Sequence, residues 1–237
     1  MIVISAAYNF TSTGYGTYTI EPSDLLHAVG SNNEISEIHA DVEPFAATIA
    51  AGKLVVARPS HPTGGSLAKR ATFTNCTASQ QTQVNTAASG AQNYASTSLT
   101  YLRTTTNTTR FRTWFGSYDG DRHDTVTDHF SRMNANNFAN FQYDCSCTTA
   151  GVFAYVYPDQ FGTVNLCPLF WPAPQTGTDS KAGTLIHEAS HFTANGGTFD
   201  IAYGQAQAQA LATAFPEGAV INADNHQYFA ENNPALP

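Results

Sequence analysis

The residues best suited to carry out chemistry are two histidines and a glutamate, in the pattern His187-Glu188-x-x-His191. Residues four apart lie one above the other on a helix, with roughly 5–6 Å between their Cβ atoms. Both imidazoles can then reach one Zn²⁺ at about 2.0–2.1 Å. Glu188 points to one side, where a carboxylate can polarise a water molecule rather than bind the metal. The spacing therefore predicts a zinc site with a base beside it.

This chemistry requires the motif to lie on a helix. The apolar and polar residues around the motif predict a helix that begins near Ser180. The pair Gly196-Gly197 follows the motif, and glycine is the usual left-handed terminator of helices. We therefore expect the helix to be closed by these two glycines.

A catalytic zinc ion needs a third protein ligand and one open position. Asp200 is the nearest carboxylate beyond the helix, and the glycine pair would let the chain fold back toward the histidines. If the chain is helical from Ile201 onward, Tyr203 projects from the same face as Asp200 and can donate a hydrogen bond to an oxyanion. Tyr203 can equally be a core aromatic residue. Spacing leaves five competitors for the third ligand: Asp179, Glu217, Asp224, His226 and Glu231.

The surrounding pattern predicts an α+β fold that is mainly helical. Thr77 to Gln80 fits a capping box, and a long amphipathic helix should follow. Its inward positions are Val84, Ala87, Ala88, Ala91, Tyr94, Ala95, Leu99 and Leu102. We expect a second helix over Thr125–Asn137. Two short strands, 152–157 and 163–167, flank a Pro/Gly loop and predict a β-hairpin.

The composition excludes several classes of function. The chain has 237 residues, of which 42% are hydrophobic and 12% charged, and its formal net charge is −8. A nucleic-acid-binding protein needs a basic surface, and so does a protein drawn to an anionic membrane. No apolar run approaches the roughly 18 residues that span a bilayer. We expect neither nucleic acid nor membrane as a partner.

The chain divides into three parts by composition. Residues 1–57 are rich in β-forming residues, with glycines between them. Residues 58–70 are a linker rich in Pro, Gly and Ser that ends in Lys69-Arg70. A dibasic pair in an exposed linker is a good proteolytic processing site, although it can also be two surface charges. The chemistry lies in residues 71–237.

The four cysteines are Cys76, Cys145, Cys147 and Cys167. An even number in a chain rich in Ser, Thr and Asn predicts a secreted protein with two disulfides, for which three pairings are possible. Three N-glycosylation sequons, at Asn9, Asn75 and Asn107, favour export. The first residues lack the basic region of a signal peptide, so we expect another export route or a missing start.

The motif continues past the helix as Gly197-Thr198-x-Asp200-x-x-Tyr203-Gly204. This combination resembles the signature of the deuterolysin, or aspzincin, family of secreted zincin-type metalloendopeptidases. The resemblance implies one Zn²⁺ per chain, with Glu188 as general base and Tyr203 as transition-state stabiliser. The implied metal ligands are His187, His191 and Asp200. The implied disulfides are Cys76–Cys145 and Cys147–Cys167.

Residues 71–237 as a whole resemble the fungal peptidyl-Lys metalloendopeptidases, and residues 1–70 resemble the C-terminal part of the family's propeptide. These relatives cut on the amino side of lysine and hold its ammonium with acidic side chains. Asp224 matches the first of these, but Gln227 stands where the family has glutamate. A neutral amide should bind an ammonium less well than a carboxylate does.

We therefore expect a secreted, monomeric zinc metalloendopeptidase, made as a zymogen, that acts on protein and peptide substrates. Residues 71–237 contain a single lysine, Lys181, which would limit self-digestion unless it reflects compositional bias alone. Two alternatives stay open. One is a related protease with broader specificity. The other is a non-catalytic zinc-binding protein, which would have a fourth protein ligand such as His226.

Overall fold

The computed structural model describes residues 48–50, 53–55 and 71–237. The chain divides into two units, residues 1–60 and 61–237. In the first unit, strands β1 (Thr48–Ala50) and β2 (Lys53–Val55) pair antiparallel, with Thr48 opposite Val55. The remaining expectations for residues 1–57 and for the linker lie outside the described residues.

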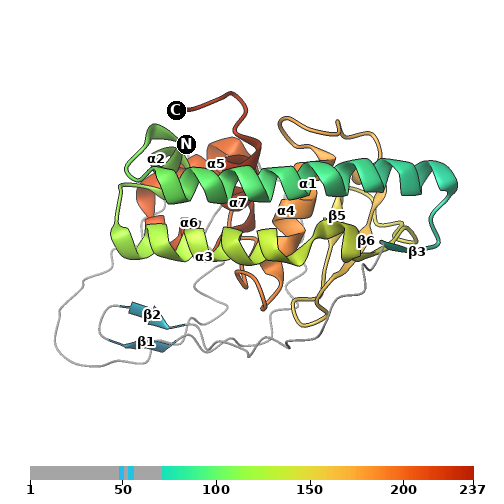
Figure 1. Cartoon of the computed structure of the whole chain (residues 1–237), viewed down its shortest axis with the longest axis horizontal. Helices are drawn as coiled ribbons and strands as arrows, with labels where there is room; N and C mark the ends of the chain where they lie inside the picture. Colours follow the sequence, from blue (N-terminus) through green and yellow to red (C-terminus); the bar gives the residue numbers. More distant parts are fainter. Residues whose placement is uncertain (1–47, 51–52, 56–70) are drawn as a thin grey trace, which may run out of the picture. The chain divides into compact units, whose positions relative to one another are not determined.

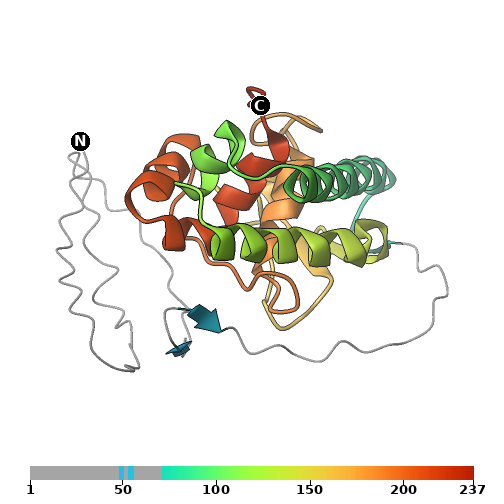
Figure 2. The ribbon, with the colours of Figure 1, turned by 60° about the vertical axis from the view of Figure 1, so that its left-hand side comes forward.

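The second unit is mainly helical, as predicted (Figure 1). The long helix α1 and helix α3 lie side by side. The sheet lies at one end of this pair, and α2, α5 and α6 gather at the other (Figures 1 and 2). The helices are α1 (Ala78–Thr104), α2 (Thr109–Phe115), α3 (Gly120–Asn136), α4 (Lys181–His191), α5 (Gln205–Ala214), α6 (Pro216–Val220) and α7 (Ala223–Glu231), with short 3₁₀ helices at Phe138–Asn140 and Pro168–Phe170. Within the described part of the chain, no helix combines the length and the apolar character needed to span a membrane.

The predicted start of α1 is confirmed. The Thr77 side chain accepts a hydrogen bond from the Gln80 N–H, and the Gln80 side chain accepts one from the Thr77 N–H. This capping box satisfies two backbone donors that a helix start leaves unpaired. The face that α1 buries consists of Val84, Ala87, Ala88, Ala91, Ala95, Ser98, Leu99 and Leu102. Its small residues allow α3 and α4 to pack closely against it.

A mixed four-stranded sheet has the order β3-β4-β6-β5. Strands β5 (Ala154–Tyr155) and β6 (Thr163–Leu166) pair antiparallel, so the predicted hairpin is confirmed with a shorter first strand. Strands β3 (Thr72–Thr74) and β4 (Gln142–Asp144) pair parallel to each other, and β4 pairs parallel to β6. Three-residue strands are too short to show a periodic pattern, so the sequence did not reveal β3 and β4.

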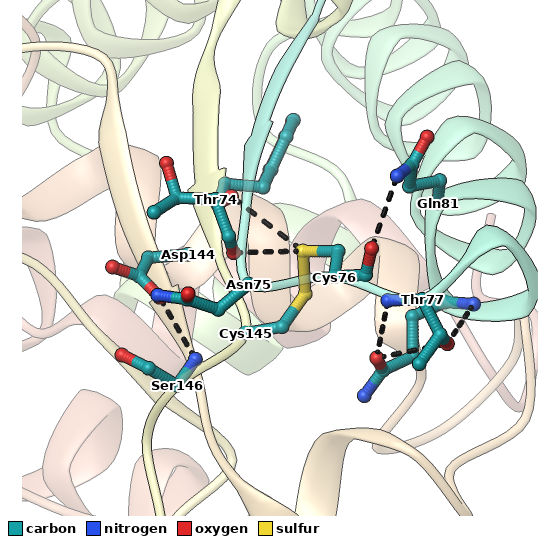
Figure 3. Close-up of a disulfide and its surroundings, with 10 residues drawn as sticks. Thr74, Asn75, Cys76, Thr77, Gln81, Asp144, Cys145 and Ser146 are labelled. Atoms are coloured by element: carbon teal, nitrogen blue, oxygen red, sulfur yellow. Dashed lines mark hydrogen bonds between the residues drawn. A yellow bond between two sulfur atoms is a disulfide. The ribbon is translucent and has the colours of Figure 1, made fainter.

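Two disulfides join the sheet to its surroundings. Cys76 pairs with Cys145 and Cys147 pairs with Cys167, as the resemblance implied. Figure 3 shows the first of these bonds between the ends of β3 and β4, next to the capping box of α1. The Gln81 side chain donates to the Cys76 carbonyl at 3.0 Å. The disulfide therefore ties the residue before the capping box of α1 to the end of β4, and the Gln81 bond fixes that residue to the first turn of the helix.

Helix α4 begins as predicted but ends early. The Ser180 hydroxyl accepts a hydrogen bond from the Gly183 N–H at 2.9 Å and caps the helix. The helix ends at His191 rather than at the glycine pair, so that prediction was wrong. The cause is a distant contact, because the Thr193 N–H is bonded to the Pro158 carbonyl at 3.1 Å instead of continuing the helix.

Helix α3 also differs from the prediction, since it begins at Gly120 and not at Thr125. The Asp119 side chain accepts from the Arg122 N–H at 3.0 Å and caps the helix five residues earlier. A carboxylate at this position also interacts favourably with the positive end of the helix dipole.

A buried carboxylate fixes the start of α4. Glu231, at the end of α7, accepts hydrogen bonds from the Asp179 N–H at 3.1 Å and the Ser180 N–H at 2.9 Å. Burial raises the pKa of Glu231 to about 7. A Cβ atom on Gly183 would lie 1.8 Å from the Glu231 Oε1, so this approach needs glycine.

We therefore expect Gly183→Ala to lower the free energy of unfolding by about 1–3 kcal/mol, because the added methyl displaces the Glu231 carboxylate. Alanine would otherwise stabilise a helix by roughly 0.5–1 kcal/mol. Gly120→Ala is the matched control, since nothing lies within 4 Å of its added Cβ. Urea denaturation of both variants measures the difference. Equal stability of the two would contradict the steric argument.

Candidate metal centre

Helix α4 brings the two histidines of the motif together. Their ring centroids are 4.9 Å apart, and the ring planes are 81° to each other. The Asp200 Oδ1 lies 3.0 Å from the His187 Nε2 and 3.3 Å from the His191 Nε2. One ligand atom from each of the three residues lies within 4.8 Å of the others. The three side chains therefore converge on one point, from which they could hold a metal ion.

The second nitrogen of each imidazole is hydrogen-bonded away from this point. The His187 Nδ1 lies 2.7 Å from the Asp224 Oδ1, and the His191 Nδ1 lies 2.8 Å from the Thr198 carbonyl. Since a carboxylate and a carbonyl accept hydrogen bonds, both Nδ1 atoms carry the proton. Each Nε2 is therefore the nitrogen that faces Asp200, and it is the atom that would bind a metal ion.

Thr198 folds the chain back onto α4. Its hydroxyl donates to the Ser190 Oγ at 2.6 Å, and Ser190 in turn donates to the His187 carbonyl at 2.6 Å. The Thr198 N–H donates to the Ser190 carbonyl at 3.2 Å. Sequence reasoning did not assign a role to Thr198, although its place directly after Gly197 in the motif was the available signal.

The segment that follows carries Asp200 and Tyr203 without a helix. Helix α5 begins only at Gln205, so the helix from Ile201 that would have placed Tyr203 on one face with Asp200 is not formed. Tyr203 is 63% exposed, which also rules out the alternative of a core aromatic residue. The pKa of its phenol is raised, first by partial burial and then by the Asp200 carboxylate beside it. The phenol therefore keeps its proton and can act as a donor.

The two acidic groups of the centre have opposite electrostatic settings. Burial raises the pKa of Glu188, although the two histidines act against the rise. Burial also acts to raise the pKa of Asp200, but hydrogen bonds with His187 and His191 outweigh it and hold the pKa well below its usual range. Among the described residues, nothing donates a hydrogen bond to the Glu188 carboxylate. Asp200 is therefore an anion that can serve as a metal ligand, and Glu188 is a carboxylate that can accept a proton.

The other candidates for the third ligand have different partners. Asp224 contacts the His187 Nδ1, on the side of the ring away from Asp200. His226 is buried and bonded to the His129 Nδ1 at 3.0 Å. Of the three remaining candidates, Asp179 is bonded to Tyr228 and Glu217 to Arg122. Glu231 is bonded to Ser180.

The residues expected to bind substrate both lie on α7 and are buried. Both Asp224 oxygens already accept hydrogen bonds, one from the His187 Nδ1 and the other from the Gly204 N–H at 2.6 Å. The Gln227 Nε2 lies 3.4 Å from the Glu231 Oε1. Asp224, Gln227 and Glu231 are three and four residues apart and therefore share one face of α7.

The donor set fits a catalytic zinc ion. Two imidazole nitrogens and one carboxylate oxygen are the ligand types that Zn²⁺ accepts. Three protein ligands leave a fourth position of a tetrahedral site for water or substrate. Both histidines also have the hydrogen-bonded Nδ1 that accompanies metal-ligating imidazoles.

Comparison with known proteins agrees with this geometry. Residues 100–231 match the family model Aspzincin_M35, described as lysine-specific metallo-endopeptidase. The chain is 55% identical over 234 residues to a peptidyl-Lys metalloendopeptidase of Grifola frondosa. This match spans 98% of the chain and 66% of that relative, which is just under two thirds of the relative's length. An extracellular protease of Aeromonas hydrophila is 46% identical over 68% of the chain and 46% of its own length. A solved zinc peptidase from Grifola frondosa superposes with a TM-score of 0.68 at 60% identity, covering 68% of this chain and all of that structure.

The contact between Asp224 and His187 makes a testable prediction about metal affinity. We expect Asp224→Asn to weaken zinc binding by about 10–100-fold, because an amide is a weaker partner for the imidazole than a carboxylate. Competition with a chelator measures the affinity. Asp128→Asn is the control, since it removes the same charge from a pair with Arg132 in α3. Equal affinities of the two variants would show that Asp224 does not support the ligand.

Proposed function

Since the chain belongs to the aspzincin family of lysine-specific metallo-endopeptidases, we propose that it is a secreted zinc endopeptidase. It acts as a single chain on proteins and peptides and hydrolyses bonds on the amino side of lysine. The observation that carries the proposal is the convergence of two Nε2 atoms and the Asp200 carboxylate beside a buried Glu188.

The proposed ligands of zinc are His187, His191 and Asp200. When bound, zinc would activate a water molecule and polarise the scissile carbonyl. Glu188 takes the proton of the attacking water and passes it to the leaving amine. Burial raises the pKa of Glu188, which makes its carboxylate a better proton acceptor in the first step. Tyr203 donates its phenolic hydrogen to the oxyanion that develops on the substrate.

The same cluster speaks against a non-catalytic zinc protein. Structural zinc sites are usually closed by four protein ligands. In the described part of the chain, the metal-binding group consists of three residues, and His226 is bonded to His129 instead of completing it. A site with three ligands favours an enzyme.

For lysine recognition, we propose Asp224 and Gln227 on α7. Asp224 lies directly behind His187 and carries a charge next to the metal centre. Gln227 follows one helical turn later, and Glu231 follows Gln227 after another turn. An amide oxygen and a carboxylate can together replace part of the hydration of an ammonium ion.

The placement of lysine in residues 71–237 supports this specificity. Lys181 is 3% exposed, and its ammonium is bonded to the carbonyl oxygens of Trp171, at 2.7 Å, and Ala173. The bond before Lys181 lies at the capped start of α4, where a protease cannot reach it without unfolding the helix. An enzyme that cuts before lysine would therefore spare its own folded domain.

We propose that residues 1–57 are a propeptide fragment that is removed by cleavage in the linker 58–70. The solved relative corresponds to 68% of this chain, which is close to the share of residues 71–237. Secretion is supported by two disulfides, which persist in oxidising compartments, and by the extracellular relative.

The assignment of the base predicts the behaviour of Glu188→Gln. We expect this variant to bind zinc normally, because Glu188 is not a ligand, and to lose about 10²–10⁴-fold in kcat/KM. Peptide hydrolysis and metal content, measured on the same preparation, test both parts. Hydrolysis close to that of the unmodified protein would refute the role of Glu188.

The lysine pocket predicts a gain of function. We expect Gln227→Glu to lower KM about 10-fold for peptides with lysine at P1′, because a carboxylate binds ammonium more strongly than an amide does. Gln227→Met, which keeps a similar size but removes the amide, should raise KM for the same peptides. A matched peptide with norleucine at P1′ is the control. If both variants keep the original preference for lysine, the pocket lies elsewhere.

A further inference from the structure

The segment that carries Asp200 and Tyr203 lacks a secondary structure of its own to hold it. Residues 201–204 lie between an isolated bridge at Phe199 and the start of α5, and they form neither helix nor strand. The Asp200 side chain is 37% exposed and Tyr203 is 63% exposed. A ligand and an oxyanion donor must nevertheless be placed within fractions of an ångström. Other residues must therefore fix this segment.

The side chain of Asn222 makes the contacts that this task requires. Its Oδ1 accepts hydrogen bonds from the Ile201 N–H at 2.8 Å and the Ala202 N–H at 3.1 Å. Its Nδ2 donates to the Ala202 carbonyl at 3.0 Å and to the Asn225 Oδ1 at 2.7 Å. Three of these four bonds hold the two residues that separate Asp200 from Tyr203.

The backbone around Asn222 holds the same segment from the other side. Phe199 forms a parallel bridge with Asn222: the Phe199 N–H donates to the Ile221 carbonyl at 2.8 Å, and its carbonyl accepts from the Ala223 N–H at 3.0 Å. Asp200 is thus flanked by a backbone anchor on one side and a side-chain anchor on the other.

Asn222 is itself rigidly placed. It is fully buried, and its carbonyl accepts from the His226 Nδ1 at 3.0 Å. The His226 Nε2 then accepts from the His129 Nδ1 at 3.0 Å, which connects Asn222 to helix α3. Burial lowers the pKa of His226 to about 4, so this imidazole is neutral near pH 7 and its Nε2 is free to accept the bond from His129.

We propose that Asn222 is a positioning residue that sets where Asp200 and Tyr203 stand relative to the histidines of α4. The inference rests on the proposed function only in taking Asp200 as a metal ligand. An amide is the suitable group here, because adjacent N–H and C=O groups of a backbone need an acceptor and a donor together. Aspartate keeps the acceptor but loses the donor, and leucine loses both.

The test compares Asn222→Asp and Asn222→Leu in the full chain. We expect zinc affinity, measured by chelator competition, to fall about 10-fold in Asn222→Asp and about 100-fold in Asn222→Leu. The visible absorption of the Co²⁺-loaded protein should change in the same order, because it reports the geometry of the ligands. In peptide hydrolysis at saturating zinc, kcat should fall while KM stays within about twofold.

Gln92→Leu is the matched control. Gln92 makes three hydrogen bonds of the same kind, to Asn134 and Phe138, and none to the metal site. Its loss should lower Tm without altering zinc affinity or the Co²⁺ spectrum. If Asn222→Leu does not fold, the outcome for Asn222→Asp decides.

Folded Asn222 variants with a lowered Tm but unchanged affinity and spectrum would overturn the proposal, since Asn222 would then be structural alone. Failure of the unmodified protein to bind zinc would instead overturn the proposed function. The two failures are therefore distinguishable in the same series of measurements.

Discussion

The packing of α4 against α7 is the interaction on which the rest of the centre depends. Helix α4 supplies both histidines and Glu188, while α7 supplies a carboxylate at each end of the contact. Asp224 bonds His187 at one end, and Glu231 bonds the capped start of α4 at the other. The two carboxylates are seven residues apart, about two helical turns. A shift of α7 by a single residue would break both contacts, so the register of the helix pair is closely determined.

Helix α7 is unusual because it is buried all round and yet rich in polar side chains. Burial of polar groups destabilises a fold unless each group finds a partner. Here the partners are present: Asn225 donates to the carbonyls of Trp114 and Ala208, and His226 bonds Asn222 and His129. The rings of Phe115 and Phe130 contact His226 and separate this network from water. Such a satisfied network favours one arrangement over the alternatives that an apolar helix would tolerate.

The parts of the structure that the sequence predicted are those encoded by neighbouring residues. The capping box at Thr77, the cap at Ser180 and the i, i+4 pair of histidines all depend on spacings of three or four residues. The start of α3 was missed although its cap at Asp119 is local, whereas two other departures from expectation involve distant contacts. The end of α4 is determined by a bond between Thr193 and Pro158, and the course of the chain after Ile201 is determined by Asn222, 21 residues later. The resemblance pointed to Asp224 as a residue that binds substrate, but its contact with His187 spans 37 positions and is visible only in three dimensions.

The metal centre has a buried side, formed by helix α4, and an exposed side, formed by the segment that carries Asp200 and Tyr203. The two sides are held in place differently. Glu188 and the histidines lie on a helix that is almost entirely buried, so their geometry follows from the packing of that helix. Asp200 and Tyr203 lie at the surface, where packing contributes little to their position. Their precision must come from hydrogen bonds to the backbone between and beside them, at Ile201, Ala202 and Gly204. All three bonds end on the first residues of α7 or its cap, Asn222 and Asp224. Helix α7 and its cap therefore hold the exposed side of the centre and also orient the buried side. This shared support lets a segment without regular secondary structure act as part of a rigid site.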